Sequence, residues 1–321
     1  MKISVITPNY NGSKYLKNYF NSLALEKEYI KEIIIVDNGS SDDSILNIKK
    51  LAGDLGFNFK IIENKSNLGF AKAINQGIKI SSSKFVYLLN NDVEIEKGAI
   101  STLINFISDK DDVFSLSSKM IQYNNRNLID DAGDEYTLFG WTKKAGNNVS
   151  IDKYNENREI FASCAGAALY RKEIFNEIGF FDENFVSYVE DIDLGFRSQI
   201  FGYKNYYVAN SIVYHIGSAT SGSKYNEFKI KISARNNVWL IYKNFTIPLK
   251  IINILFLIVG FLVKYLFFLK KGYGNIYLKG IKEGLNNRDK IKKTDFHMKN
   301  IKNYFKIEWK LIINTIKSIK K

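Results

Sequence analysis

Short apolar runs alternate with amphipathic stretches over the first ninety residues of the chain. Four runs, at residues 3–8, 33–36, 59–62 and 85–89, are rich in Val, Ile, Leu and Phe and have the length of buried strands. The stretches at residues 13–23 and 71–80 carry apolar side chains at helical spacing. Strands that alternate with helices are typical of βαβ units. The pattern therefore predicts an α/β fold built around a parallel sheet.

Each predicted strand ends in, or leads shortly to, a polar cluster. The clusters are Asn9–Gly12, Asp37–Ser40, Asn67–Phe70 and Asn90–Asp92. In an open parallel sheet, ligands bind beyond the carboxyl ends of the strands, so we expect these clusters to form one site. A carboxylate there is placed to hold Mg²⁺ or Mn²⁺ together with a substrate's phosphates. The alternative for the last cluster alone is an Asn/Asp turn after a buried strand.

Taken in order, these segments resemble the family 2 glycosyltransferases. The resemblance extends through residues 166–171, 179–183 and 190–194 and covers roughly residues 1–240. It is closest to the rhamnosyl- and galactofuranosyltransferase-like members, which share the segment 67–71 and a later segment like 215–218. The resemblance implies a GT-A fold, which is a Rossmann-like mixed sheet flanked by helices. It also implies a nucleotide-sugar donor, a divalent cation (Mg²⁺ or Mn²⁺) and inversion at the anomeric carbon.

The same resemblance implies the metal ligands. The family's metal motif is usually Asp-x-Asp, but its first position here is Asn90, which offers only a neutral carbonyl oxygen and predicts weaker cation binding. Asp92 would then carry most of the coordination. His215 is the additional ligand by resemblance, and a structural histidine is the alternative.

Inverting transfer needs a base that takes the proton of the attacking hydroxyl. Three acids, Glu190, Asp191 and Asp193, stand at the start of a predicted helix over residues 191–201. Capping of the helix is the alternative, because carboxylates are favoured in a first turn, but three acids exceed what a cap requires. We expect Asp191 to be the base, with Glu190 or Asp193 holding the loop or the acceptor.

The resemblance also implies which residues contact the donor and the acceptor. Asp37 would read the nucleobase, Gly69 would allow close backbone approach, and Arg235 would reach the diphosphate, with a solvated helix charge as the alternative for Arg235. Residues 119–159 would shape the acceptor site with aromatic faces such as Trp141, a mobile surface loop being the alternative. The full expected donor set is Thr7, Pro8, Asn9, Tyr10, Asp37, Asn38, Gly69, Phe70, Asn75, Asn91 and Arg235.

The C-terminal part has a different composition. Residues 247–269 are almost wholly apolar, and residues 270–321 carry 15 Lys and Arg against 4 Asp and Glu, a net +11 of the chain's +13. We therefore expect a catalytic domain over residues 1–245 and a membrane-associating extension over residues 246–321. The basic excess lies outside the catalytic part, so an anionic membrane surface is the expected partner and nucleic acid is not. Monotopic attachment is favoured over one span, because a span would place the basic tail across the membrane from the active site. The third alternative is that residues 247–269 form a helix of a soluble core or of an oligomer interface. A homo-oligomer is therefore a further possible assembly.

Localisation and function follow from these expectations. Cys164 is the single cysteine, which fits a reducing compartment, and residues 3–6 are too short for a signal peptide. We expect a protein on the cytoplasmic face of the membrane. It would move a sugar from a dTDP- or UDP-sugar, with dTDP-rhamnose as a candidate, to a hydroxyl of a lipid-linked or cell-surface polysaccharide acceptor. The alternative is an inactive nucleotide-sugar-binding or scaffold protein of glycan assembly.

Overall fold

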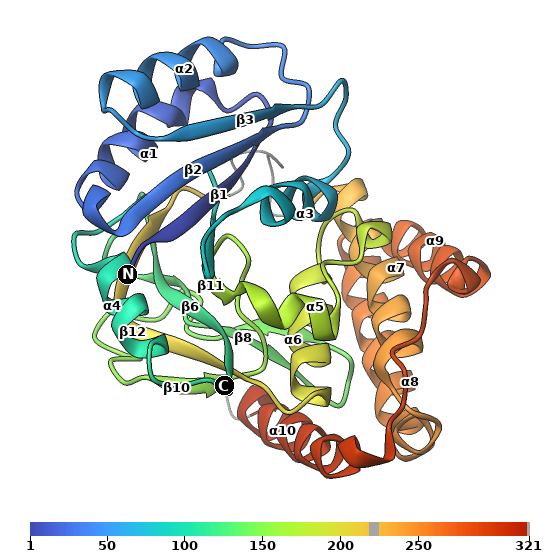
Figure 1. Cartoon of the computed structure of the whole chain (residues 1–321). Helices are drawn as coiled ribbons and strands as arrows, with labels where there is room; N and C mark the ends of the chain where they lie inside the picture. The colour runs from blue at the N-terminus through green and yellow to red at the C-terminus, as the bar shows by residue number, and fades with distance from the viewer. Residues whose placement is uncertain (218–224, 320–321) are drawn as a thin grey trace.

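A 10-stranded mixed sheet forms the centre of the computed structural model, which describes residues 1–217 and 225–319 (Figure 1). Along its main path the strands run β10-β12-β6-β11-β4-β1-β2-β3, while β5 pairs with β12 and β7 with β6. A separate two-stranded ribbon joins β8 and β9. Ser218, at the end of the quoted segment 215–218, lies outside the described residues. The strands are β1 (Ile3–Asn9), β2 (Ile30–Asp37), β3 (Phe59–Glu63), β4 (Phe85–Leu89), β5 (Val93–Ile95), β6 (Val113–Gln122), β7 (Ile129–Asp131), β8 (Asp134–Tyr136), β9 (Thr142–Lys144), β10 (Arg158–Ile160), β11 (Ala167–Arg171) and β12 (Lys204–His215).

The four strands predicted from the apolar runs form the parallel half of the sheet. β1 pairs in parallel with both β2 and β4, and β2 pairs in parallel with β3. In the β1–β2 ladder Asn9 lies opposite Asp37, so these two polar ends meet at one edge as predicted. Every side chain of β4 is buried, which explains why this strand is a continuous apolar run in the sequence.

The other half of the sheet brings a distant histidine to the same edge. β11 lies antiparallel between β4 and β6, and β12 runs parallel to β6, so the sheet is mixed. At its carboxyl end β12 also pairs with the short strand β5, where His215 lies opposite Val93. Val93 directly follows Asp92, so this register brings His215 beside Asp92, although more than one hundred residues separate the two in sequence.

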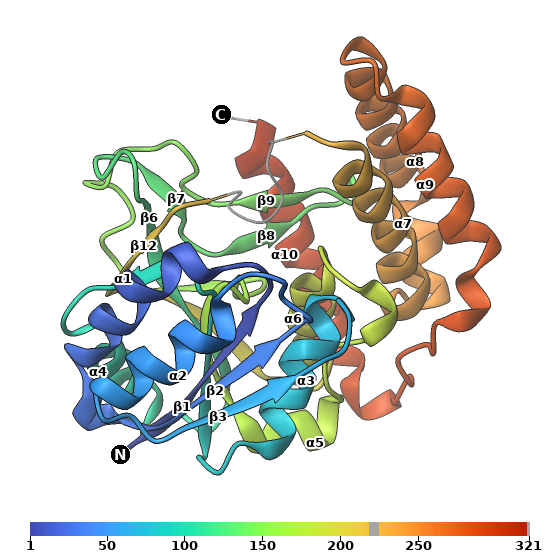
Figure 2. The same cartoon turned by 90° about the horizontal axis from the view of Figure 1, so that it is seen from above.

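Helices cover both faces of the sheet. One apolar core joins α1, α2 and α4 to one face through residues such as Leu16, Ile48 and Leu103, and a second joins α3, α5 and α6 to the other (Figures 1 and 2). The helices are α1 (Ser13–Ala24), α2 (Ser44–Asp54), α3 (Phe70–Ile80), α4 (Ala99–Ile107), α5 (Phe175–Ile178), α6 (Glu190–Ile200), α7 (Glu227–Asn244), α8 (Ile247–Lys270), α9 (Gly274–Asn286) and α10 (Ile301–Ile319). Short 3₁₀ turns occupy Lys27–Tyr29, Lys172–Ile174, Glu183–Phe185, Arg288–Lys290 and Met298–Asn300.

The C-terminal helices are built onto the part of the chain that carries the sheet. A third core joins α6, α7, α8 and α10, with Leu311 of α10 fully buried in it. Thr315 of α10 accepts a hydrogen bond from the backbone N–H of Leu138 at 2.9 Å. α9 packs closely on α7, where a Cβ at Gly284 would come within 2.8 Å of Val238. The expected boundary at residue 245 thus falls between α7 and α8, but the helices beyond it complete the core of the body.

α8 has two unlike sides. Its buried residues, Leu249, Asn253, Leu257 and Gly260, recur every three or four positions and therefore form one face. Among the described helices, α8 is the one long and apolar enough to cross a bilayer, yet only 17% of its most apolar stretch is buried. Most of its apolar side chains therefore point away from the protein.

Candidate functional site

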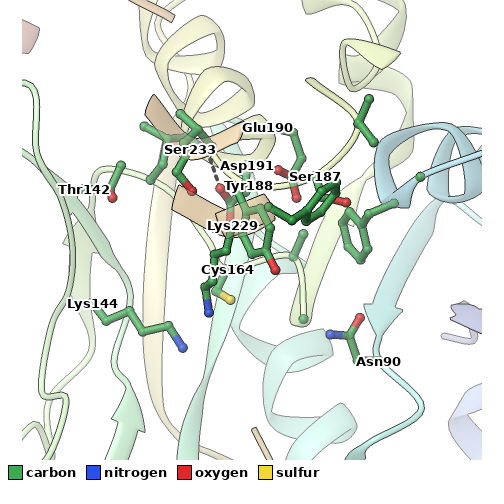
Figure 3. Close-up of a pocket in the computed structure, with 18 of the residues that line it drawn as sticks. Asn90, Thr142, Lys144, Cys164, Ser187, Tyr188, Glu190, Asp191, Lys229 and Ser233 are labelled. Carbon is green, nitrogen blue, oxygen red and sulfur yellow. Dashed lines mark hydrogen bonds between the residues drawn. The ribbon is translucent and has the colours of Figure 1, made fainter. Parts of the chain in front are cut away.

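A cavity of about 1270 Å³ opens at the carboxyl edge of the sheet. The loops after β1, β2 and β4 form one part of its wall. The start of α6, strand β9 and helix α7 form the rest (Figure 3). The predicted site residues that line it are Pro8, Asn9, Tyr10, Asn38, Gly69, Phe70, Asn91, Asp92, Glu190, Asp191 and His215. The structure thus gathers most of the expected donor, metal and base residues around one space.

A hydrogen-bonded chain of polar side chains orders the loops after β1, β2 and β4. We call these the donor loops, because most of the residues expected to bind the donor lie on them or at the strand ends that lead into them. Asn9 donates to Asp37 at 2.7 Å and accepts from Asn91 at 2.6 Å, so it ties the ends of β1, β2 and β4 together. A Cβ at Gly12 would collide with both Asn9 and Asn91. Glycine at position 12 therefore lets this polar chain form.

Asp37 acts inside this arrangement rather than on the cavity wall. One of its carboxylate oxygens accepts from the backbone N–H groups of Gly39 and Ser40, and the other accepts from Asn9 and the Ser40 hydroxyl. Its neighbour Asn38 lines the cavity and donates to the carbonyl oxygen of Gly69 at 3.2 Å. In this structure Asp37 holds the turn that presents Asn38.

Asp92 and His215 form the group best suited to a divalent cation. His215 Nε2 lies 3.6 Å from Asp92 Oδ2, while His215 Nδ1 lies 2.7 Å from Asp130 Oδ2. A carboxylate on the far nitrogen is the usual way in which a metal-binding imidazole is oriented. Burial alone would lower the pKa of His215, but its hydrogen bonds with Asp130 and Asp92 raise that pKa to about 9.

Asn90 supplies the third candidate oxygen. Asn90 lines the cavity just after β4 (Figure 3), and its Oδ1 atom is buried with no hydrogen-bond partner in the described part of the chain. A buried amide oxygen without a partner is costly unless a ligand satisfies it. The carboxylate, imidazole and amide together fit Mn²⁺ or Mg²⁺.

Asp131, Asp134 and Cys164 form a second acidic cluster, which the sequence reasoning missed. Their ligand atoms lie within 4.8 Å of one another. Lys144 lies 3.8 Å from Asp131, so a cation is already present there, and burial raises the pKa of the Cys164 thiol well above its usual value. A neutral thiol beside an ammonium is a poor site for a hard cation, so the chemistry of Asp92 and His215 fits a divalent cation better than this cluster does. The pair Asp130-Asp131, with Asp134 three residues on, was the available signal.

The loop before the proposed base is strained. Val186, Tyr188 and Val189 all have positive φ, at 65°, 67° and 71°, although none is glycine and two are β-branched. Such conformations persist only where the surroundings enforce them, and they cluster at functional sites. The loop also contacts the donor side, because the backbone N–H of Ala71 donates to the carbonyl oxygen of Val186 at 3.1 Å.

α7 holds this loop in place. The amide nitrogen of Asn236 donates to the carbonyl oxygens of Phe185, Ser187 and Tyr188 at 2.8, 2.9 and 2.7 Å. Arg235 also donates to the carbonyl oxygen of Phe185, at 3.2 Å. These contacts explain how several unfavourable backbone conformations are maintained.

Glu190 and Asp191 follow the loop directly and both face the cavity (Figure 3). Burial raises the pKa of Asp191 above its usual range, against hydrogen bonds from backbone N–H groups that lower it. Burial, and next the charge of Asp191, raise the pKa of Glu190 well above its usual range. A carboxylate with a raised pKa is a stronger base, as general base catalysis near neutral pH requires.

Several expected site residues have other roles in the structure and do not line the cavity. Asp193 is fully buried between Arg197, Lys243 and Asn244, and it braces the start of α6. Arg235 pairs with Glu283 of α9 at 3.2 Å in addition to holding the loop. Neither side chain is among the residues that line the cavity.

The remaining three are also structural. Thr7 is hydrogen-bonded to Tyr19 beneath the sheet edge, and Asn75 of α3 donates to the carbonyl oxygen of Phe181 at 2.8 Å. Trp141 donates to the carbonyl oxygen of Gly260 at 3.0 Å and so fastens α8 to the catalytic part. Trp141 was expected at the acceptor because aromatic faces suit sugars, but here its ring supports a helix–loop contact.

Comparisons with known proteins agree with this architecture. A sequence profile described as Glycosyl transferase family 2 matches residues 4–179. The O-antigen chain rhamnosyltransferase RfbN of Salmonella typhimurium is 23% identical over 232 residues, which cover 71% of this chain and 70% of that protein. The N-acetylglucosaminyl-diphospho-decaprenol L-rhamnosyltransferase of Mycobacterium tuberculosis is 24% identical over 251 residues, covering 68% of this chain and 78% of that protein.

A solved structure shows the same fold. The crystal structure of GalNAc-T7 with UDP, GalNAc and Mn²⁺ superposes with a TM-score of 0.62 at 16% identity, over 75% of this chain and 47% of that one. At this identity the likeness establishes the fold alone. It confirms the predicted GT-A architecture.

Proposed function

The chain belongs to glycosyltransferase family 2, and from that premise we propose that it transfers a deoxyhexose from a pyrimidine nucleoside diphosphate to an acceptor hydroxyl, with inversion. The observation that carries the proposal is the shared cavity. The ordered donor loops and the acids Glu190 and Asp191 line the same space, with the Asp92–His215 group beside the donor loops. Two relatives named as rhamnosyltransferases support rhamnose as the sugar.

The proposed reaction uses the residues as follows. The carboxylate of Asp191 removes the proton of the acceptor hydroxyl, and the oxygen attacks the anomeric carbon as the bond from that carbon to the phosphate oxygen breaks. The nucleoside diphosphate leaves with that electron pair. Glu190 lies beside the base, and burial followed by the charge of Asp191 raises the pKa of its carboxyl well above the usual range. A cation held by Asp92, His215 and Asn90 would neutralise the charge of the leaving diphosphate.

We propose that the donor is recognised by the shape of the cavity and by close approach of the protein backbone to the nucleotide. Asn38 and Phe70 line the cavity, and Gly69 lies where a Cβ would come within 2.7 Å of Val186. The Asn9–Asp37 contact keeps these loops in register with each other. The proposed role of Asp37 is thus to position the loop that meets the nucleotide.

We also propose attachment to a membrane surface, at its cytoplasmic face. Exposed apolar side chains along α8 and the basic excess of residues 270–321 provide the two signals that stable attachment generally needs. An acceptor linked to a lipid would be reached at such a surface. The name of the mycobacterial relative, which contains a diphospho-decaprenol acceptor, supports this acceptor class.

Thermal shift with nucleotide-sugars tests the proposal. The purified full chain is incubated with dTDP-rhamnose, UDP-N-acetylglucosamine or GDP-mannose, each with Mn²⁺ and with EDTA. A donor that binds only the folded state raises the melting temperature according to its concentration over its dissociation constant. We expect dTDP-rhamnose with Mn²⁺ to give the largest shift and to be turned over. A preference for GDP-mannose would overturn the pyrimidine assignment, and no turnover of any donor would overturn the enzymatic one.

A further inference from the structure

One end of the cavity reaches the C-terminal helices. Lys264 and Phe268 of α8 and Tyr277 of α9 line it, and we call these three residues the α8–α9 end. Lys229 of α7 lines the same cavity, with its ammonium 5.4 Å from the centre of the Tyr188 ring. The cavity is therefore continuous from the donor loops to the helix whose other side carries exposed apolar residues.

The polar groups at this end are donors without internal partners. The Tyr277 side chain is only 3% exposed, and its hydroxyl makes no hydrogen bond within the described ranges. Lys264 has no hydrogen bond or ion pair to any described residue. A buried hydroxyl is usually hydrogen-bonded, so an unpartnered one that faces a cavity indicates a missing ligand. The neighbouring acid on α9, Glu283, is already held by Lys231 at 2.7 Å and by Arg235 at 3.2 Å.

This end is distinct from the donor side. Both views place α6 and α7 between the strands β1–β3 and the helices α8 and α9 (Figures 1 and 2). Asp191, at the start of α6, lines the same cavity. A ligand at the α8–α9 end therefore shares the cavity with Asp191 but lies on different elements from the donor loops.

The two sides of α8 suggest the nature of that ligand. Leu262 and Leu266 stand two positions from Lys264 on either side, which on a helix of 3.6 residues per turn is close to the opposite face, and both are exposed. One helix thus presents an ammonium to the cavity and an apolar surface outward. A phosphate ester of a long lipid alcohol has the matching chemistry, because it joins an anionic group to an apolar chain.

We propose that the α8–α9 end binds the phosphate or diphosphate of a lipid-alcohol-linked acceptor, with Lys264 and the Tyr277 hydroxyl as its donors. The lipid chain leaves along the exposed side of α8, and the attached sugar extends toward Asp191. This inference rests on the proposed function, since it assigns the acceptor subsite of the same cavity. It names residues that the motifs of the catalytic part do not include.

Binding of farnesyl diphosphate by the full-length protein in detergent tests the inference. Titrations are performed in EDTA, so that no cation recruits the diphosphate to the donor loops, with inorganic diphosphate and farnesol as the two partial ligands. We expect farnesyl diphosphate to bind more tightly than either part. Lys264→Met should weaken it about tenfold to a hundredfold, the usual worth of a charge-assisted hydrogen bond. Tyr277→Phe should weaken it severalfold, and Lys264→Arg should restore most of the affinity that Lys264→Met loses.

Two control variants identify other binding modes. Lys282→Met removes an exposed charge from α9, and Asp92→Ala changes the donor side; neither should alter farnesyl diphosphate binding. Unchanged affinity in Lys264→Met, loss in Asp92→Ala instead, or equally tight binding of inorganic diphosphate alone would each overturn the inference. Donor turnover is measured separately, so failure of this binding leaves the proposed glycosyl transfer standing, and failure of turnover leaves the binding result interpretable.

Discussion

The side-chain nitrogen of Asn236 lies 2.7 Å from the carbonyl oxygen of Tyr188, a residue held at a φ of 67° two positions before Glu190. The same nitrogen contacts two further carbonyl oxygens of the loop. One amide on α7 therefore fixes the backbone that aims Glu190 and Asp191 into the cavity. This relationship makes Asn236 a positioning residue.

Asn236→Ala should lower the turnover number about tenfold to a hundredfold while donor affinity changes little. The loop loses the contacts that hold its strained backbone, and the free energy of unfolding should fall by about 1–3 kcal/mol. Steady-state kinetics and urea denaturation measure the two effects. Asn286→Ala, at an exposed position of α9, is the matched control. A variant that is destabilised but turns over normally would show that the hydrogen bonds of Asn236 stabilise the fold without positioning the acids.

Asp92→Ala should remove Mn²⁺-dependent turnover and leave the fold intact, because the residue follows the end of β4 rather than lying within the core. Asn90→Asp should increase the affinity for Mn²⁺, because it adds a negative charge at a buried oxygen that has no hydrogen-bond partner in the described part of the chain. Titration of Mn²⁺ in the presence of the donor measures both. Asp54→Ala, at the exposed end of α2, serves as control. Normal metal-dependent turnover in Asp92→Ala would make the assignment wrong.

Asp191→Asn should keep donor binding but lose transfer by roughly two to four orders of magnitude, the usual worth of a positioned base. The pH dependence follows from its raised pKa: the base acts only when deprotonated, so activity is present above that pKa and falls as the pH decreases through it. We therefore expect the acidic limb of kcat/KM against pH to lie above about 4, the ordinary Asp value. An equal loss of donor affinity in the variant would identify Asp191 as a nucleotide-binding residue instead.

Asp131→Asn should stabilise the protein at pH 7.5. Burial raises the pKa of Asp131 from 3.8 to about 6, so the folded state binds this proton more tightly than the unfolded state. The resulting stability is full below pH 3.8 and is lost as the pH rises through 6. Asparagine cannot ionise and therefore avoids this loss. We expect the free energy of unfolding to rise by about 1–3 kcal/mol at pH 7.5 and to change little at pH 4. Denaturant unfolding in EDTA at the two pH values measures it; a destabilised variant at pH 7.5 would show that attraction to Lys144 outweighs burial.

Membrane attachment is best tested by charges on α8. Deleting residues 247–321 would be ambiguous, because it removes Leu311 and other core residues as well as the apolar surface. Ile251 and Leu255 are 68% and 72% exposed, so Ile251→Asp with Leu255→Asp should leave the fold intact and reduce liposome flotation strongly. Leu46→Asp, on α2 at 66% exposure, is the matched control. A doubly substituted protein that floats like the wild type would make α8 irrelevant to attachment.

Much of the fold was predictable because its signals are local. The parallel strands are buried on both faces and so appear as continuous apolar runs, and the polar ends of β1, β2 and β4 mark the shared edge. The resemblance added His215, whose approach to Asp92 depends on a pairing across the sheet. These signals predicted that the loops after β1, β2 and β4 would lie at one edge, where they line the cavity.

The rest depends on contacts that no local pattern encodes. Asp130 reaches His215 only because β7 pairs with β6, and Asn236 reaches the strained loop only because α7 packs beside α6. The resemblance implied Arg235 at the diphosphate, with a solvated helix charge as the alternative, and the structure pairs its side chain with Glu283. The basic tail was expected to associate with a membrane as a separate extension, and the pattern gave no sign that Tyr304, Ile307 and Leu311 of α10 belong to the core.

The position of α10 also has a consequence for biosynthesis. Its buried side chains close a core that α6 and α7 leave open, and α10 follows the sheet and α8 in the chain. Because synthesis runs from the N-terminus, the sheet and the apolar α8 leave the ribosome before α10 can dock. During that interval α8 lacks its α10 contact, the Asn253–Glu308 hydrogen bond. The apolar side of α8 is thus exposed before the core around α6, α7 and α10 has finished folding.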